Sequence, residues 1–136
     1  VLEIQQLAMT LHCAAIRLAM VNGDREVIVS ELKERLEEYV HATNPHDEVM
    51  AVKEFLGTYY HNCGNRRLDR HMLAIQGQQT LLRHIYAANV KERGAEAETF
   101  RQMLDSTIAG DADAVCQTLQ KYTDHMTLIV EGAVSR

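Results

Sequence analysis

The sequence has no tryptophan, only two phenylalanines and a single proline among its 136 residues. This scarcity disfavours a β-sandwich, whose strands are rich in aromatic and β-branched residues and whose turns use proline. Hydrophobic residues still make up 46% of the chain, which excludes intrinsic disorder. A chain of this length buries roughly 65 to 70% of its unfolded surface without a metal or disulfide. The composition therefore predicts a helical protein with an aliphatic core.

Cysteine and positive charge are also scarce. Cys13, Cys63 and Cys116 are an odd number without C-x-x-C spacing, so neither a disulfide framework nor a thiolate zinc site is expected. This cysteine usage predicts a cytoplasmic location, with Cys13 and Cys116 as small core residues. Because 14 basic residues face 19 acidic ones, for a net charge of −5, a surface that binds DNA or anionic lipid is not expected.

No long uninterrupted apolar run is present. The most apolar stretch, residues 2–21, is interrupted by Glu3, Gln5, Gln6, His12 and Arg17. It is predicted to be a core helix, and neither a membrane span nor a signal peptide. Because an amphipathic pattern begins at Val1, we expect the chain to be a fragment of a longer protein.

Six helices are predicted from apolar residues that recur at three- and four-residue steps. Asn22-Gly23-Asp24 ends the first helix, and Asp24 caps a second that reaches Val40. Glu31 and Arg35 in the second helix are expected to form an i,i+4 ion pair on its solvated face. Pro45 begins a third helix that runs to about Asn62.

Glycine and its neighbours punctuate the second half. Gly64 is expected to end the third helix in a left-handed conformation, and Asn65 to cap a fourth whose middle is weakened by Gly77. The fifth helix is predicted over 95–109, and Gly110-Asp111 leads into a sixth that reaches about residue 134. Short connections favour antiparallel neighbours, so the predicted fold is one all-α antiparallel bundle over residues 1–136.

Motifs for catalysis or metal binding are lacking. No two of the seven histidines are three or four residues apart, so no helix presents a pair of imidazoles to one ion. His61 and Cys63 are two apart and point to different sides of a helix, which disfavours a nucleophile with its base. No glycine loop for phosphate is present, and the basic cluster Arg66, Arg67 and Arg70 is most simply surface charge. An enzyme is therefore not predicted.

Three segments, in this order, resemble a known regulatory domain. They are Leu7 to Ala19, then Phe55 ten residues ahead of Asn65 in Cys63-Gly64-Asn65, and finally Ile108 to Ala114 around Gly110-Asp111. Together they are similar to the C-terminal ligand-binding and dimerisation domain, called FCD, of FadR-type regulators in the GntR family. The resemblance spans nearly the whole chain and implies an all-helical fold and a homodimer.

Many FCD domains bind a metal through one aspartate and three histidines. By the resemblance these four places fall on Val52, Leu56, Phe100 and Tyr122. Hydrocarbon side chains cannot replace nitrogen and carboxylate donors, so no metal and no other cofactor is expected. The family's effector-binding arginine falls on Ala8, and the acidic residue four later falls on His12.

These substitutions predict an apolar effector pocket. Val52 and Leu56, one helical turn apart, are expected to face Phe100 and Tyr122 across the interior, with His12 and the Tyr122 hydroxyl as polar groups. The resemblance then implies that the chain is the effector-sensing and dimerising half of a bacterial transcription regulator. In such a regulator a winged-helix domain, expected to be missing from the N-terminal side of this chain, would bind the DNA. The long first and fourth helices are the expected dimer face.

Two alternatives remain open. The same side chains could fill the core, leaving an oligomerisation or protein-interaction scaffold without a ligand. The protein could also be a helical metalloprotein that uses a different set of donors, brought together from separate helices: His12, His71, His84 and His125.

Overall fold

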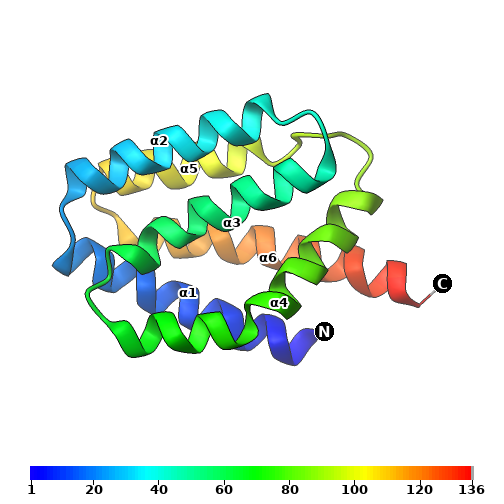
Figure 1. Ribbon diagram of the computed structural model, residues 1–136, viewed down its shortest axis with the longest axis horizontal. Coiled ribbons are helices and arrows are strands. Elements are labelled where there is room, and N and C mark those ends of the chain that lie inside the picture. Colours follow the sequence, from blue (N-terminus) through cyan, green and yellow to red (C-terminus); the bar gives the residue numbers. More distant parts are fainter. Residues whose placement is uncertain (136) are drawn as a thin grey trace.

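The computed structural model describes residues 1–135, which form six α-helices and no β-strand (Figure 1). The predicted all-α fold class is thereby confirmed. The helices are α1 (Leu2–Asn22), α2 (Arg25–His41), α3 (Pro45–His61), α4 (Arg66–Asn89), α5 (Ala97–Ile108) and α6 (Ala112–Val134).

Side-chain caps set most of the helix starts. The Asp24 carboxylate accepts the backbone N–H groups of Glu26 and Val27, and the Asn65 side chain does the same at the start of α4. Asn44 and Asp111 each accept one N–H in the first turn of α3 and α6. These bonds satisfy N–H groups that have no partner within the helix, which confirms the predicted starts.

One helix prediction needs correction. Helix α5 begins at Ala97 and not at residue 95, because residues 91–96 form turns that include Gly94 at φ +76°. Helix α4 runs across Gly77 to Asn89 as one helix that bends in its middle (Figure 1). A glycine in a helix interior costs about 1 kcal/mol relative to alanine, and the weakening expected from Gly77 stays a prediction.

The connection between α5 and α6 needs a glycine. Gly110 has φ +73°, a left-handed conformation that side chains with a Cβ rarely adopt. A Cβ at this position would also lie 2.8 Å from the guanidinium of Arg25 at the start of α2. Gly64 has φ +70° between α3 and α4, as predicted.

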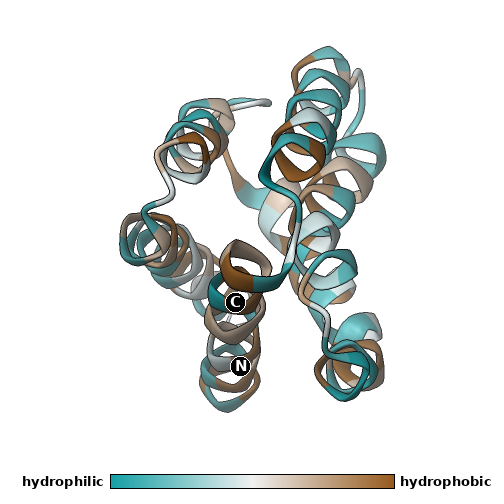
Figure 2. Cartoon of the chain, turned by 90° about the vertical axis from the view of Figure 1, so that its left-hand side faces the viewer, coloured by the Kyte–Doolittle hydropathy of each residue, from teal (hydrophilic) through white to brown (hydrophobic). Residues whose placement is uncertain are grey.

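The helices pack around a common interior. Figure 1 shows α2 beside α5, and the inter-helix contacts also pair α2 with α3, α3 with α4, and α1 with both α4 and α6. The end-on view of Figure 2 shows hydrophobic and hydrophilic residues on each of these helices. Inside, a chain of polar side chains crosses three helices: Gln79 of α4 donates to Gln5 of α1 at 3.0 Å, and Gln5 donates to Thr127 of α6 at 3.3 Å.

The ion pair expected on α2 has a different partner. Arg35 pairs with Glu38 at 2.7 Å instead of with Glu31.

Helix α1 also differs from its expectation. The polar residues of α1 were expected to exclude a membrane span, but the helix is long and apolar enough, by length and composition, to cross a membrane. In the fold, α1 packs against α3, α4 and α6 and buries seven side chains, and a buried core helix can have the same length and composition.

Candidate functional site

All six residues predicted to form the effector site lie in the interior. Their exposed fractions are 5% or less, and they come from four helices: Ala8 and His12 on α1, Val52 and Leu56 on α3, Phe100 on α5 and Tyr122 on α6. None points outward to water. Their burial is compatible with a ligand site and also with ordinary packing, so their role in ligand binding stays a prediction.

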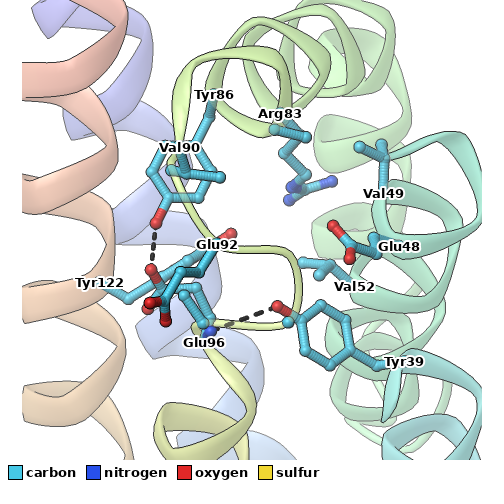
Figure 3. A pocket seen from close by; sticks show the side chains of 13 residues that line it. Tyr39, Glu48, Val49, Val52, Arg83, Tyr86, Val90, Glu92, Glu96 and Tyr122 are labelled. Carbon is cyan, nitrogen blue, oxygen red and sulfur yellow. Dashed lines mark hydrogen bonds between the residues drawn. The ribbon is translucent and has the colours of Figure 1, made fainter. Parts of the chain in front are cut away.

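Two small cavities divide this set of residues. Val52 and Tyr122 line a cavity of about 20 Å³ among α2, α3, α4 and α6, shown in Figure 3. His12 and Leu56 line a second cavity of about 60 Å³ among α1, α3 and α4. A water molecule needs at least about 10–15 Å³ on this measure, so the first cavity has room for about one water.

Phe100 and Ala8 line neither cavity. The Phe100 ring packs against three other rings, with centroid separations of 5.1 Å to Phe55, 5.2 Å to Tyr39 and 5.4 Å to Tyr122. Ala8 is 1% exposed within the same core. At these two positions side chains fill the space, as the scaffold alternative predicts for the whole interior.

Arg83 of α4 is the residue that the two cavities share. Its side chain reaches into the first cavity in Figure 3 and lines the second as well. The residue is 5% exposed, and its Nε has no hydrogen-bond partner. In the part of the chain that the structure describes, no carboxylate lies within ion-pair distance of it.

Burial lowers the pKa of Arg83, while the nearby Tyr122 and Tyr60 act in the opposite direction. A guanidinium nevertheless stays charged in a protein, so the interior holds a positive charge that no carboxylate of residues 1–135 contacts as an ion pair, although Glu48, Glu92 and Glu96 line the same cavity. An anion at this place would supply both the missing charge and a hydrogen-bond acceptor. The site therefore has a cationic group that the six predicted residues lack.

Glu48 of α3 stands on another side of the first cavity. Its side chain is 8% exposed, and its Oε1 lies 3.9 Å from Nε of Arg93, too far for a hydrogen bond. Burial raises the pKa of this carboxyl group, and Arg93 lowers it to a lesser extent. The cavity thus has one basic group, Arg83 on α4, and three acidic residues: Glu48 on α3, with Glu92 and Glu96 in the segment that follows α4.

A non-helical segment, residues 90–96, closes one side of the first cavity. Contacts hold it to α2, α3 and α4: the backbone N–H of Glu96 donates to the Tyr39 hydroxyl at 3.3 Å, the Tyr86 hydroxyl donates to the Glu96 carboxylate, and Arg93 pairs with Glu48 at 3.9 Å. Arg93 also donates to the backbone carbonyl of Thr43. This segment is the only wall of that cavity within residues 1–135 that is not part of a helix.

His12 is a neutral polar group at the second cavity. Its Nδ1 lies 2.8 Å from the Tyr60 hydroxyl, and burial, aided by Arg83, lowers its pKa to about 3. At neutral pH the ring is uncharged, so Nδ1 can accept the hydrogen bond from Tyr60. The pair presents polar atoms to the cavity without adding charge.

Neither the family's metal site nor the alternative histidine site has a suitable donor set. The matched ligand places hold three hydrocarbon side chains and one phenol, which do not fit a divalent ion. Among residues 1–135, no three His, Cys, Asp or Glu side chains are close enough to hold a metal ion. The metalloprotein alternative on His12, His71, His84 and His125 is therefore wrong: His84 instead stacks on His46, with ring centroids 5.5 Å apart.

The sequence reasoning missed Arg83, Glu48 and Tyr60. A signal for Arg83 was present, because it shares the buried face of α4 with Ile75, Gln79, Leu82 and Tyr86. These residues recur at helical spacing, so a charged residue on that face was open to detection. Glu48 gave a similar signal, because it shares the buried face of α3 with Val52 and Phe55 at helical spacing.

Comparisons with known proteins bear on the fold and the family. The family model of the FCD domain matches residues 3–125, which is most of the chain. Neither the curated proteins nor the solved structures gave a match. With six helices in the order described and this match, the chain belongs to the FCD family, the C-terminal effector-binding and dimerisation domain of GntR-family regulators such as FadR.

Proposed function

We propose that this domain senses its effector without a metal, and that the effector is largely apolar with one anionic group. Arg83 carries the proposal, because it is a buried cation without an acidic partner and it borders both cavities. Val49, Val52 and Val90 supply apolar walls to the first cavity. A carboxylate on the ligand would pair with the guanidinium in a bidentate geometry, and its apolar part would pack on the valines.

Binding requires an expansion of the interior. A ligand pocket usually has about 300–1,000 Å³, far more than either cavity provides. Segment 90–96 is the wall that can move without unfolding a helix, and its movement would open the first cavity to solvent. The effector would then favour the open arrangement over the closed one, which is how a ligand shifts a conformational equilibrium.

A thermal-shift experiment tests the sensor. We expect straight-chain carboxylates such as octanoate to raise the melting temperature of the wild type, and the matching alcohols to raise it less. Arg83→Met should abolish the response to the acid. Arg70→Met, an exposed arginine on the same helix, is the matched control and should respond like the wild type.

If no carboxylate or other small anion raises the melting temperature, the sensor proposal fails and the scaffold alternative takes its place. The small cavities and the filled surroundings of Phe100 favour that alternative. In that case Arg83→Met should stabilise the protein, because it removes an unpaired buried charge and gains nothing else.

Metal independence is tested separately. Since the matched ligand places hold Val52, Leu56, Phe100 and Tyr122, we expect EDTA to leave the melting temperature unchanged. We expect the purified protein to hold less than stoichiometric zinc, nickel or manganese. Stoichiometric retained metal, or destabilisation by EDTA, would contradict this part of the proposal.

We propose that two copies associate through α1 and α4, the helices expected to form the dimer face. Leu7, Leu73 and Leu81 on these helices are 46%, 57% and 60% exposed, so apolar side chains are available for contact with a second copy. Leu81→Glu should give a monomer in analytical ultracentrifugation if this face pairs. Leu128→Glu, on α6 and 70% exposed, is the control and should stay dimeric.

We further propose a cytoplasmic, non-enzymatic role in transcription, with DNA contacted by a winged-helix domain outside residues 1–136. The net charge of −5 supports this division, because a DNA-contacting surface needs excess positive charge. Residues 1–136 alone should therefore show no retention of duplex DNA in a gel-shift assay at low salt. Tight binding by these residues would contradict the division.

A further inference from the structure

Two of the three cysteines lie opposite each other between α1 and α6. The helices run antiparallel, because Gln5 hydrogen-bonds Thr127 at 3.3 Å near one end and Arg17 pairs with Asp113 at 2.6 Å near the other. This register places Cys13 level with Cys116. The two thiols are close enough to interact, and each shifts the pKa of the other.

The two sulfur atoms differ in their access to solvent. Cys13 is half-buried and lines an open groove of about 440 Å³ between α1 and α6. Cys116 is 5% exposed and belongs to the core. A small oxidant can reach Cys13 from the groove, and Cys116 stands directly behind it.

The charges around the pair favour a thiolate at Cys13. Interaction with the Cys116 thiol and the charge of Arg17 lower the pKa of Cys13 to about 7, although partial burial opposes them. Interaction with the Cys13 thiol, burial and the charge of Asp113 raise the pKa of Cys116. Since the thiolate is the form that reacts with peroxides, Cys13 is the more reactive thiol of the two.

We propose that Cys13 and Cys116 are a site of reversible oxidation by hydroperoxides, which joins α1 to α6 by a disulfide. In the first step the Cys13 thiolate attacks the peroxide: an S–O bond forms, the O–O bond breaks, and the alkoxide or hydroxide that leaves takes a proton from solvent to become an alcohol or water. In the second step the Cys116 sulfur attacks Cys13: an S–S bond forms, the S–O bond breaks, and the hydroxide leaves as water with the Cys116 proton. The thiol pair loses two electrons and the peroxide gains them.

This reaction is independent of the effector site. Neither cysteine lines either interior cavity, and neither is part of the proposed anion-binding group. The packing of α1 on α6 already places the two cysteines at the same level, and the side chains must close to the S–S length of a disulfide, about 2.05 Å. Cys63 is apart from the pair, since its thiol donates to the backbone carbonyl of Asn65 at 3.6 Å.

The test is peroxide oxidation of the reduced protein, residues 1–136, with hydrogen peroxide as the probe. Free thiols, counted with Ellman's reagent in denaturant, should fall from three to one. Tryptic peptides 1–17 and 102–121, which contain Cys13 and Cys116, should appear as one disulfide-linked species that dithiothreitol separates. The oxidised protein should melt at a higher temperature than the reduced one.

Single substitutions separate this site from general oxidation. Cys63→Ser should leave the linked peptides unchanged, whereas Cys13→Ser and Cys116→Ser should each abolish them. Cys116 is buried, so its variant could fold poorly. The deciding variant is therefore Cys13→Ser, at the half-buried position, and circular dichroism checks that it is folded. Three persisting thiols in the wild type, or a linkage that involves Cys63 or a second chain, would overturn the proposal.

Discussion

His12 gives a quantitative prediction about stability and pH. In the unfolded chain its pKa is 6.5, and in the folded protein burial lowers it to about 3. Between these values the unfolded chain binds the proton and the folded protein does not, so stability falls as the pH falls below 6.5. From pH 7 to pH 5 the difference amounts to about 2 kcal/mol of unfolding free energy from this residue alone.

Urea unfolding at the two pH values, followed by far-UV circular dichroism at one protein concentration, measures this term. His12→Asn is the comparison, because its side chain can still accept a hydrogen bond from Tyr60 but does not titrate. Other groups with shifted pKa values, such as Glu48, are common to both proteins and cancel in the difference. Wild type should lose about 2 kcal/mol more than the variant on acidification. Equal losses would show that His12 is not a buried neutral imidazole, and the interior described around Tyr60 would be wrong.

Three further substitutions probe the core and the glycines. Leu56→Asp replaces a buried leucine by a carboxylate, so it should lower the free energy of unfolding in urea by at least about 4 kcal/mol and abolish any ligand response. Near-normal stability of this variant would mean that Leu56 is misplaced. Gly110→Ala should cost about 1 kcal/mol, since its left-handed backbone strains a Cβ. Gly77→Ala, in the middle of α4 with open space around it, should instead stabilise by up to about 1 kcal/mol, and a loss of stability there would contradict a regular helix at this point.

Local signals predicted the fold well. Asp24, Asn44, Asn65 and Asp111 each accept an N–H at the helix start where the sequence placed it. A capping side chain bonds to backbone N–H groups two or three residues further along the chain, so a short stretch of sequence is enough to predict it. The start of α5 was placed two residues early because Glu96 makes no side-chain cap there.

The candidate site was harder to predict because cavities depend on packing between distant segments. Family positions led to six buried residues, but sequence has no measure of the volume between them. Arg83 was overlooked because a single arginine in an apolar stripe resembles a residue whose charge extends to the surface. Its burial without a partner is a property of the assembled helices.

The chain of amide and hydroxyl groups through Gln79, Gln5 and Thr127 constrains how this domain can transmit a signal. A lengthwise slide of one of these helices past the others would break the bonds between the three side chains and leave the buried Gln79 amide without its partner. These bonds therefore favour a movement in which α1, α4 and α6 tilt together. In a dimer assembled on α1 and α4, such a tilt would change the angle between the two subunits.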